Sequence, residues 1–480
     1  MSWTSGDVIN TQTRLRRLSS SIPSSYTVFK IGDTYYAETN IAGGTDATPN
    51  TDAAVVLRFA NAALSSTGGT IFLRKGTYVC SSLVEITNTS PSRSAALIPA
   101  DNVAVIGESK GGTILQLGNS VGGSLIAFED HTPTTKYGFH LQNLTLDGNK
   151  ANQSDSGVDG DLVGLRMYAH QRCHIENVRI INCKRQGLYV TNGQWNNYID
   201  VSCDSNDREG FVWDSEGLCD ASGIRANSNG QVGIYIVGGA SREITWVTMT
   251  EGEAYGNIKG GVKITQAIGV SLYGVKAWQN GDASNILDGF MINDSESVYL
   301  TDCQAYHNQR AGVSVYGDST RVHIKGGCYY NNREDGASGN GFGIVLSSAS
   351  YCRVTGVDAY DNQTPKKQLG GVQEVDTSDY NYIAFNDFRG NANTNPITKL
   401  GANTRMLFNR GCVTENSGTS TGTGAQQTIA HGLVSTPNRV FLSESTTGGA
   451  LAYQSAAADA TNIYVTATSA KTYQWRAEVV

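Results

Sequence analysis

The stretches Gly187-Leu188-Tyr189-Val190, Gly210-Phe211-Val212-Trp213 and Gly233-Ile234-Tyr235-Ile236 repeat one pattern, a glycine followed by alternating apolar residues. The pattern returns three more times, beginning at Gly261, Gly289 and Gly312. A second signature follows each copy and ends in an asparagine. These asparagines stand at Asn206, Asn229, Asn257, Asn280, Asn308, Asn331 and Asn362, with successive spacings of 23, 28, 23, 28, 23 and 31 residues. A repeat in the twenties indicates a solenoid.

The repeat predicts three short strands per period, because its apolar residues alternate with period two and are β-branched or aromatic. Residues that tolerate positive φ recur at fixed positions and mark the corners: Asp200, Gly223, Gly274, Asp302 and Gly356. We therefore expect a parallel β-helix of about ten coils, with rungs about 4.8 Å apart. Buried asparagines should stack at one corner. A leucine-rich repeat is excluded because its leucine framework is missing.

The composition sets the domain organisation and excludes some partners. With 480 residues and 39% hydrophobic content, the chain can bury a large core. We expect an N-terminal docking or leader segment at 1–45, the β-helix at 46–412 and a small C-terminal β domain at 413–480. The net charge of −7 and the absence of a polybasic run argue against a nucleic-acid partner. Nine single cysteines lack zinc-site spacing, and Cys303, Cys328 and Cys352 are predicted core residues.

The N-terminal sequence lacks the features of a signal peptide, and the chain has no apolar run of about 18 residues. We therefore expect synthesis in the cytoplasm and no membrane insertion. A short helix is expected over Ile9–Leu18. A second helix over Asp52–Leu64, with Thr51 as its cap, should be buried nearly all round and cover the open end of the β-helix.

Several motifs between the second helix and the repeats carry a family resemblance. They are Gly68-Gly69-Thr70-Ile71-Phe72-Leu73, Gly76-Thr77-Tyr78, Val105-Ile106-Gly107-Glu108 and Leu144-Thr145-Leu146-Asp147-Gly148-Asn149. Together with the Asp-Ala-Ala start of the helix, this order resembles the pectate-lyase-like right-handed β-helix family, especially phage tailspikes and polysaccharide depolymerases. The resemblance implies right-handed winding, a polysaccharide substrate, a homotrimer and attachment to a phage tail. The family includes lyases, glycoside hydrolases, epimerases and inactive adhesins.

The pattern stops near Arg410, and Thr419–Gly424 has the composition of a linker. Four later segments are predicted strands of a small antiparallel domain: Gln427–Leu433, Arg439–Leu442, Asn462–Val465 and Tyr473–Arg476. This domain resembles small C-terminal domains of phage tail proteins, which implies trimerisation or sugar binding.

The resemblance places the substrate on the outer face of the strand that begins at each repeat glycine. Leu188, Phe211, Ile234 and Val262 are predicted to point inward. The outward ladder then contains charged and aromatic residues, namely Arg166, Tyr168 and His170, then Tyr189, Asp214, Glu216, Tyr235 and Lys263. Trp213 is predicted to lie in the core.

Two kinds of reaction are open to this ladder. Asp214 and Glu216, two residues apart on one strand, should lie about 7 Å apart on one face, a spacing that suits glycoside hydrolysis by two carboxylates. Elimination needs instead a base and a cation beside the sugar carboxylate, and Arg166, His170 and Lys263 are candidates for those roles. Tyr168, Tyr189 and Tyr235 are predicted to stack on sugar rings. No epimerase motif of the Asp-Pro-His type is present.

No cofactor is required by either reaction. The acidic loop with Asp155, Asp159 and Asp161 offers carboxylate oxygens for Ca²⁺, although its spacing is not that of an EF-hand. The alternative to an enzyme is a receptor-binding adhesin that binds polysaccharide without cleaving it. Charged residues on an outward strand face also serve simply to keep the sheet soluble and unpaired.

Overall fold

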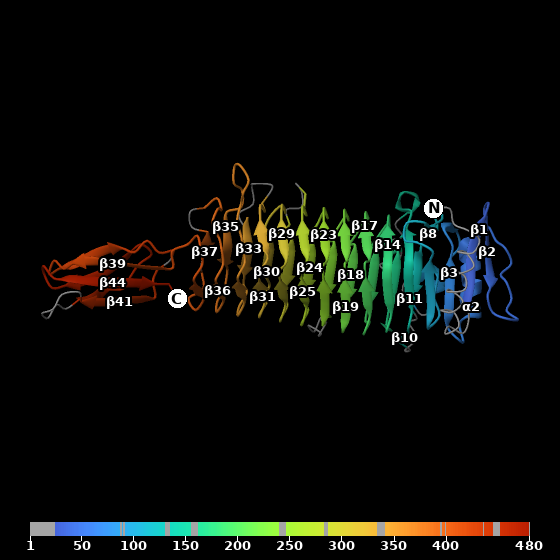
Figure 1. Ribbon diagram of the computed structural model, residues 1–480, viewed down its shortest axis with the longest axis horizontal. Helices are drawn as coiled ribbons and strands as arrows, with labels where there is room; N and C mark the ends of the chain where they lie inside the picture. The colour runs from blue at the N-terminus through green and yellow to red at the C-terminus, as the bar shows by residue number, and fades with distance from the viewer. Residues whose placement is uncertain are drawn as a thin grey trace, which may run out of the picture. The chain divides into compact units, whose positions relative to one another are not determined.

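The computed structural model describes residues 25–479, except 87–88, 90–91, 130–134, 155–161, 240–245, 283–286, 334–340, 394–395, 399, 435 and 445–451. The chain divides into two compact units, Met1–Ile258 and Lys259–Val480, and each contains its own parallel strands. Figure 1 labels many of the strands, which are short and repeat regularly along the chain. In the described part, no helix is long and apolar enough to cross a membrane.

In the first unit, one sheet contains the strands that follow the repeat glycines. Its members pair in parallel in chain order: β6 Arg93–Leu97, β9 Ser124–Phe128, β12 Leu165–Tyr168, β15 Leu188–Thr191, β18 Phe211–Asp214 and β21 Ile234–Val237. Strand β5 Val84–Ile86 pairs antiparallel with β6. Leu188, Phe211 and Ile234 are fully buried, and so is Trp213, which confirms the predicted inward face.

The other sheet of the first unit begins with the parallel strands β3 Gly69–Leu73, β7 Val103–Gly107, β11 His140–Asp147 and β14 His174–Ile181. Strands β4 Gly76–Cys80 and β8 Thr113–Leu117 pair alongside them and lead to β11. After β14 the sheet continues as two short strands per coil: β16 Asn197–Ile199 with β17 Ser202–Asp204, β19 Cys219–Ser222 with β20 Arg225–Asn227, and β22 Val247–Thr250 with β23 Glu253–Tyr255. The short elements β10 Lys136–Tyr137, β13 His170–Gln171 and the 3-10 helix η1 Lys150–Asn152 complete the unit.

From β15 to β23 each coil contributes three strands, as the repeat predicts; β15, β16 and β17 form one such coil. The corners between β16 and β17 and between β19 and β20 have positive φ, 46° at Asp200 and 66° at Gly223. In the second unit Gly274, Asp302 and Gly356 have φ of 63°, 52° and 66°. All five predicted corners are confirmed.

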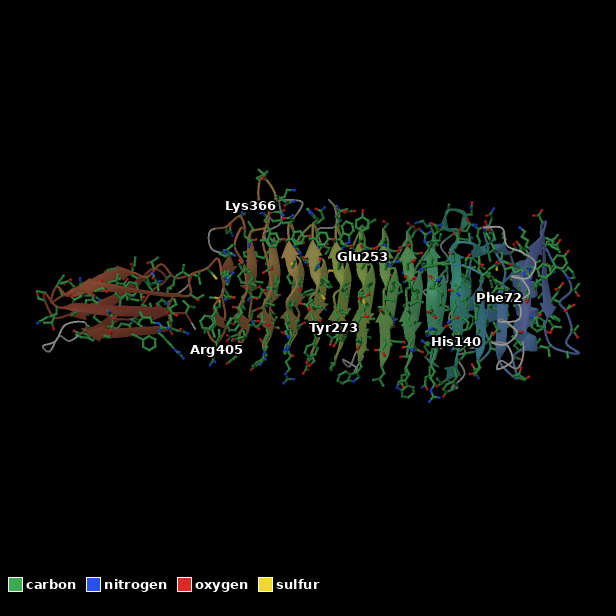
Figure 2. All side chains as sticks on the ribbon, viewed as in Figure 1. Phe72, His140, Glu253, Tyr273, Lys366 and Arg405 are labelled. Carbon is green, nitrogen blue, oxygen red and sulfur yellow. The ribbon has the colours of Figure 1, made fainter. Side chains whose placement is uncertain are left out.

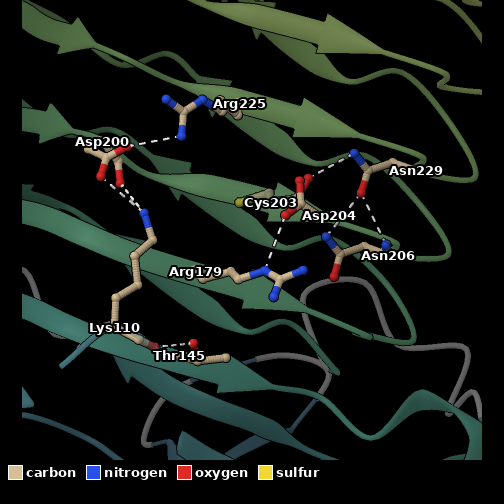
Figure 3. Close-up of polar contacts among 9 residues, drawn as sticks. All are labelled: Lys110, Thr145, Arg179, Asp200, Cys203, Asp204, Asn206, Arg225 and Asn229. Atoms are coloured by element: carbon tan, nitrogen blue, oxygen red, sulfur yellow. Dashed lines mark hydrogen bonds and ion pairs between the residues drawn. The ribbon is translucent and has the colours of Figure 1, made fainter. Parts of the chain in front are cut away.

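Buried amides form a ladder at another corner. In the first unit, the backbone N–H and side-chain amide of Asn206 donate to Oδ1 of Asn229, and those of Asn229 donate to Asn257, at 2.9–3.1 Å. Figure 3 shows Asn206 and Asn229 beside the surface ion pair of Arg179 with Asp204. A ladder of this kind satisfies the polar backbone groups of a turn that carries no strand hydrogen bonds.

The second unit has a ladder too, but two of its predicted members differ. It runs through Asn280, Asn308, Asn332, Gln368 and Asn391. Asn331 and Asn362 instead hydrogen-bond to each other beside this ladder. The prediction chose the wrong member of the pair Asn331-Asn332, because both residues lie within one position of the repeat spacing.

The first unit begins with an antiparallel hairpin, β1 Ser25–Ile31 and β2 Thr34–Thr39, whose first strand pairs in parallel with β3. Residues 25–39 thus extend the β-helix sheet, whereas the expected helix Ile9–Leu18 lies outside the described residues. Helix α2 spans Ala53–Ala63 and is capped by Asp52, whose side chain accepts from the Ala54 N–H, so Thr51 is not the cap. The helix is amphipathic rather than buried all round, since Val55 and Phe59 are each 37% exposed.

In the second unit, the corresponding strands again pair in parallel: β24 Val262–Thr265, β27 Phe290–Asn293, β30 Val313–Tyr316, β33 Phe342–Ser347, β35 Gly370–Val375 and β37 Ile397–Thr398. A second parallel series is β25 Ser271–Tyr273, β28 Tyr299–Thr301, β31 His323–Lys325, β34 Arg353–Thr355, β36 Tyr382–Ala384 and β38 Arg405–Leu407. A third is β26 Lys276–Trp278, β29 Gln304–Tyr306 and β32 Cys328–Tyr330.

The last strands of the second unit are antiparallel. One three-stranded sheet has the order β39 Glu415–Thr421, β44 Thr472–Glu478 and β41 Arg439–Glu444. The other has the order β40 Gln426–Ala430, β43 Asn462–Ala467 and β42 Ala452–Ala456. The four predicted strands are confirmed, but the expected linker Thr419–Gly424 begins inside β39. All nine cysteines are free, and Cys303 and Cys352 are buried as predicted, while Cys328 is partly exposed.

Candidate functional site

The candidate site is the outer face of strands β12, β15 and β18 in the first unit. The strand register aligns Arg166 with Tyr189, and Tyr189 with Val212. A second outward row aligns Tyr168 with Thr191, and Thr191 with Asp214. Side chains on these two rows come from neighbouring coils about 4.8 Å apart, so their functional groups can meet.

Arg166 points outward but is held against the sheet by Glu129. Its Nε donates to Oε2 of Glu129 at 2.7 Å, and its side chain is only 5% exposed. Arg93 approaches the same oxygen of Glu129 at 4.0 Å. Two guanidinium groups thus approach one buried carboxylate. The terminal amino groups of Arg166 donate to none of the described residues.

Tyr189 links Arg166 to a carboxylate. The Arg166 guanidinium carbon lies 5.0 Å from the centre of the Tyr189 ring, in cation–π geometry. The Tyr189 hydroxyl donates to Oδ2 of Asp214 at 3.2 Å, and Ser215 donates to the other Asp214 oxygen at 3.1 Å. Burial, followed by the nearby Asp214 charge, raises the pKa of Tyr189. At neutral pH Tyr189 is therefore protonated and can act as an acid.

Glu216 does not face outward beside Asp214, contrary to the prediction. Strand β18 ends at Asp214, and Ser215 adopts φ 52°, so the next side chain turns into the core. Glu216 is 1% exposed and accepts hydrogen bonds from Asn196 (2.7 Å) and Tyr198 (3.0 Å). Burial raises its pKa to about 7. The expected pair of carboxylates on one face is therefore wrong.

His170 is also turned inward, because Ala169 has φ 47° and ends the alternation of β12. The imidazole is fully buried, with its Nε2 3.7 Å from Oε2 of Glu216, and burial lowers its pKa to about 3. Neither ring nitrogen hydrogen-bonds to a described residue. A Cβ on Gly193 would lie 2.2 Å from Glu216 and 2.5 Å from His170, so only glycine fits over this pair. His170 cannot reach a substrate on the outer face.

The remaining predicted site residues lie at three different places in the chain. Tyr168 and Tyr235 are partly exposed on the outward rows of β12 and β21, as predicted. Lys263 is partly exposed on β24, in the second unit. Asp155, Asp159 and Asp161 lie outside the described residues.

Sequence reasoning missed Glu129 and Arg93. Glu129 follows the apolar run Ser124–Phe128, whose register pairs Ile126 with Leu165. The preceding glycine, Gly123, stands three residues before Ile126, whereas each repeat glycine stands directly before the equivalent position. This coil therefore lacks the glycine-led pattern at the repeat register, and only the alignment of Phe128 with Met167 shows that Glu129 follows on the outward side.

Comparison with known proteins agrees with this architecture. Residues 199–338 match the family described as "Right handed beta helix region", and the chain contains a right-handed parallel β-helix. No curated protein matches the chain by sequence. The A-module of the Azotobacter vinelandii mannuronan C-5 epimerase AlgE6 is similar in structure, with TM-score 0.62, 21% identity, and coverage of 75% of this chain and 95% of that module.

Two further solved structures are similar. The A-module of AlgE4, a mannuronan C-5 epimerase of the same organism, gives TM-score 0.59 and 20% identity, covering 74% of this chain and 96% of that module. The pre-mature gene product 12 of bacteriophage phi29 gives TM-score 0.54 and 14% identity, covering 73% of this chain and 53% of the phage protein. At these identities the likeness establishes the fold.

Proposed function

We propose that this chain binds an acidic polysaccharide across strands β12, β15 and β18 and cleaves it by β-elimination. The observation that supports the proposal is the contact series Arg166, Tyr189 and Asp214, which brings a cation, a hydroxyl and a carboxylate onto one outward face. Elimination beside a uronate carboxylate needs these three functions. A cation stabilises the developing enolate, a base removes the C5 proton, and an acid protonates the leaving oxygen.

Each residue has one role in this proposal. The terminal amino groups of Arg166 bind the sugar carboxylate, and Asp214 takes the proton from C5. The C4–O4 bond then breaks as the C4–C5 double bond forms, and Tyr189 gives its proton to O4. Asp214 returns its proton to Tyr189 across their 3.2 Å hydrogen bond, which restores the starting state. Acid and base lie on one side of the sugar, so the proton and the leaving oxygen depart from the same face.

Two features support an acidic polymer over a neutral one. Arg166 donates to Glu129 only through Nε, so its terminal amino groups can pair with a sugar carboxylate. The mannuronan epimerase modules that share the fold are named for a polyuronate, and C5 epimerisation begins with the same proton removal. We further propose that the protein is part of a phage particle, an idea supported by the fold likeness to a phi29 gene product.

The test is to incubate the purified protein with mannuronan, polygalacturonate and a neutral glucan, following ultraviolet absorbance of the new double bond together with reducing ends. We expect both signals to rise with an acidic polymer. Asp214→Asn and Tyr189→Phe should each lower the rate by about 10²- to 10⁴-fold, the usual contribution of a general acid or base. Asp204→Asn, a carboxylate on the other sheet of the preceding coil, is the matched control and should not change the rate.

Other outcomes would contradict elimination in distinct ways. Reducing ends without absorbance would mean hydrolysis, and inversion at C5 detected by NMR would mean epimerisation. Binding without any product would leave a non-catalytic adhesin. Because side chains supply cation, base and acid, activity should survive EDTA. Loss of activity that Ca²⁺ restores would instead support a calcium site at Asp155, Asp159 and Asp161.

A further inference from the structure

A groove lies on the other sheet of the first unit, away from the Asp214 face. It consists of two cavities of about 520 Å³ and 490 Å³ that share His140 and Arg172 as lining residues. His140, labelled in Figure 2, stands at the start of β11. We call this feature the corner groove. Its lining includes Thr70, Ala104, Tyr137, His140, Gln142, Arg172, His174, Trp195 and Asn197.

The corner groove crosses strands rather than following one. Strand register places Thr70 beside Ala104, Ala104 beside His140, and His140 beside His174, which in turn pairs with Asn197. The groove thus spans five adjacent strands, β3, β7, β11, β14 and β16, or about 19 Å at the strand spacing. A shape of this length, continuous from coil to coil, suits a linear polymer better than a small molecule.

Exposed aromatic side chains border the corner groove. Tyr137 is 41% exposed and Trp195 is 49% exposed. Trp195 occupies a corner with φ 57°, and the next coils place Leu218 (φ 53°) and Trp246 (φ 40°) at the equivalent corner. Leu218 and Trp246 are 49% and 54% exposed. Large apolar residues in a left-handed conformation, about half exposed on successive coils, are typical of an interaction surface.

The charges of the lining are of one sign. Arg172 is exposed, contributes to both cavities, and forms no ion pair with any described residue. The His140 and His174 rings lie 5.7 Å apart, and no Asp or Glu lines either cavity. The nearby carboxylate of Glu176 is already engaged, by His174 at 3.0 Å and by Gln142 at 3.0 Å. The surface therefore offers aromatic faces, neutral hydrogen-bonding groups and a cation.

We propose that the corner groove is a second carbohydrate-binding site, which holds an acidic polysaccharide chain separately from the Asp214 face. Indole and phenol faces pack against sugar rings with little loss of entropy, and Arg172 pairs with acidic groups of the chain. A second copy of the protein fits the corner groove less well than a polysaccharide does, because the lining mixes aromatic side chains with histidine, amide and guanidinium groups. The site increases affinity for long polymers by holding the chain at two places.

The test uses the full chain carrying Asp214→Asn, so that the polymer stays intact, and measures binding to polygalacturonate, mannuronan and a neutral glucan by calorimetry. In this background Trp195→Ala and Arg172→Ala should each weaken binding of acidic polymer by about tenfold, the effect of losing a well-placed anchor. Arg225→Ala removes an exposed arginine that pairs with Asp200 elsewhere on the unit and should leave affinity unchanged. Unchanged melting temperatures would show that the variants fold.

The outcomes separate this proposal from the proposed cleavage. In the otherwise wild-type chain, Trp195→Ala should leave the rate on short oligosaccharides unchanged while raising KM for polymer. Cleavage of polymer with no effect of Trp195→Ala or Arg172→Ala on binding would overturn the corner groove and leave elimination standing. Binding that is sensitive to both substitutions, without product from the wild-type chain, would support the groove and overturn elimination. Absence of polysaccharide binding, or equal binding of single-stranded DNA, would overturn the groove assignment.

Discussion

Two buried residues with opposite pKa shifts, Glu216 and His170, lie together inside the coils that carry the candidate site. Glu216 stays protonated in the folded chain to a higher pH than in water, with a pKa of about 7, because burial penalises its charged form. His170 stays neutral down to a lower pH, with a pKa of about 3, for the same reason. Both groups therefore favour uncharged states and link folding to pH in opposite directions.

The effect of Glu216 on stability has a definite sign. Its folded pKa is about 7 against an ordinary value of 4.5, so the folded chain binds the extra proton between these pH values. Its contribution is fully present below the lower value and is lost as pH rises through the higher one. The loss amounts to about 3 kcal/mol in the free energy of unfolding.

Glu216→Gln should remove this dependence, because glutamine keeps the shape and cannot ionise. Urea unfolding at pH 5 and pH 8 measures this dependence. As pH rises, Glu216→Gln should become more stable relative to the wild type. The effect of His170, which lowers stability as pH falls through about 6 toward 3, is common to both proteins and cancels in the comparison. A pH-independent difference between the two proteins would contradict the assigned burial of Glu216.

The strands and corners of a single coil are the features that the sequence predicts best. The repeat predicts three strands per coil, the inward side of Leu188, Phe211 and Ile234, and the corners at Asp200 and Gly223, because periodicity and turn chemistry are local. Ser215 and Ala169 were not predictable as corners, since neither residue type favours positive φ. One such residue moves the next side chain from the outer face to the core, which misplaced both Glu216 and His170.

The hydrogen bonds of Asn229 in the amide ladder should contribute measurably to the stability of the β-helix. Asn229 accepts from Asn206, donates to Asn257 and donates to the Cys203 carbonyl at 3.0 Å. Asn229→Ala leaves the Asn206 donors and the Cys203 carbonyl buried without partners, which should lower the free energy of unfolding by about 3 kcal/mol or more. Chemical denaturation tests it, with Asn227→Ala as control, because Asn227 stands outside the ladder in the same coil. Equal losses in both variants would show that the ladder has no special role.

The exposed ion pairs between neighbouring coils contribute little to the stability of the β-helix. Figure 3 shows Lys110 and Arg225 approaching Asp200 from different coils, at 3.2 Å and 3.4 Å. These groups are partly solvent-exposed, so such pairs contribute little net stability. The coils are held instead by their buried aliphatic interior and by the satisfied amides, so the outward rows are free to vary. Function can therefore occupy them, as we propose for Arg166, Tyr189 and Asp214.

The whole chain has an exposed apolar surface that a homotrimer would cover. The antiparallel strands of the second unit expose Phe441 and Tyr453 to 51% and 57%. Apolar groups of this size at a surface favour contact with another chain. We propose that these residues lie in the trimer contact, and that light scattering of the full chain will give three times the 51.2 kDa chain mass.

The substitutions Phe441→Asp and Tyr453→Asp place charge in that contact and should reduce the mass to that of one chain, because an unpaired charge is costly to bury. The fold of the parallel strands should be unaffected, so circular dichroism and the rate on short acidic oligosaccharides are expected to match wild type. Arg476→Ala, on the neighbouring strand β44, serves as a control, since its guanidinium already pairs with Glu415 at 2.9 Å within the same chain. If both aspartate variants remain trimeric, the trimer contact does not involve Phe441 and Tyr453. If the wild-type chain is monomeric, the proposed trimer is wrong.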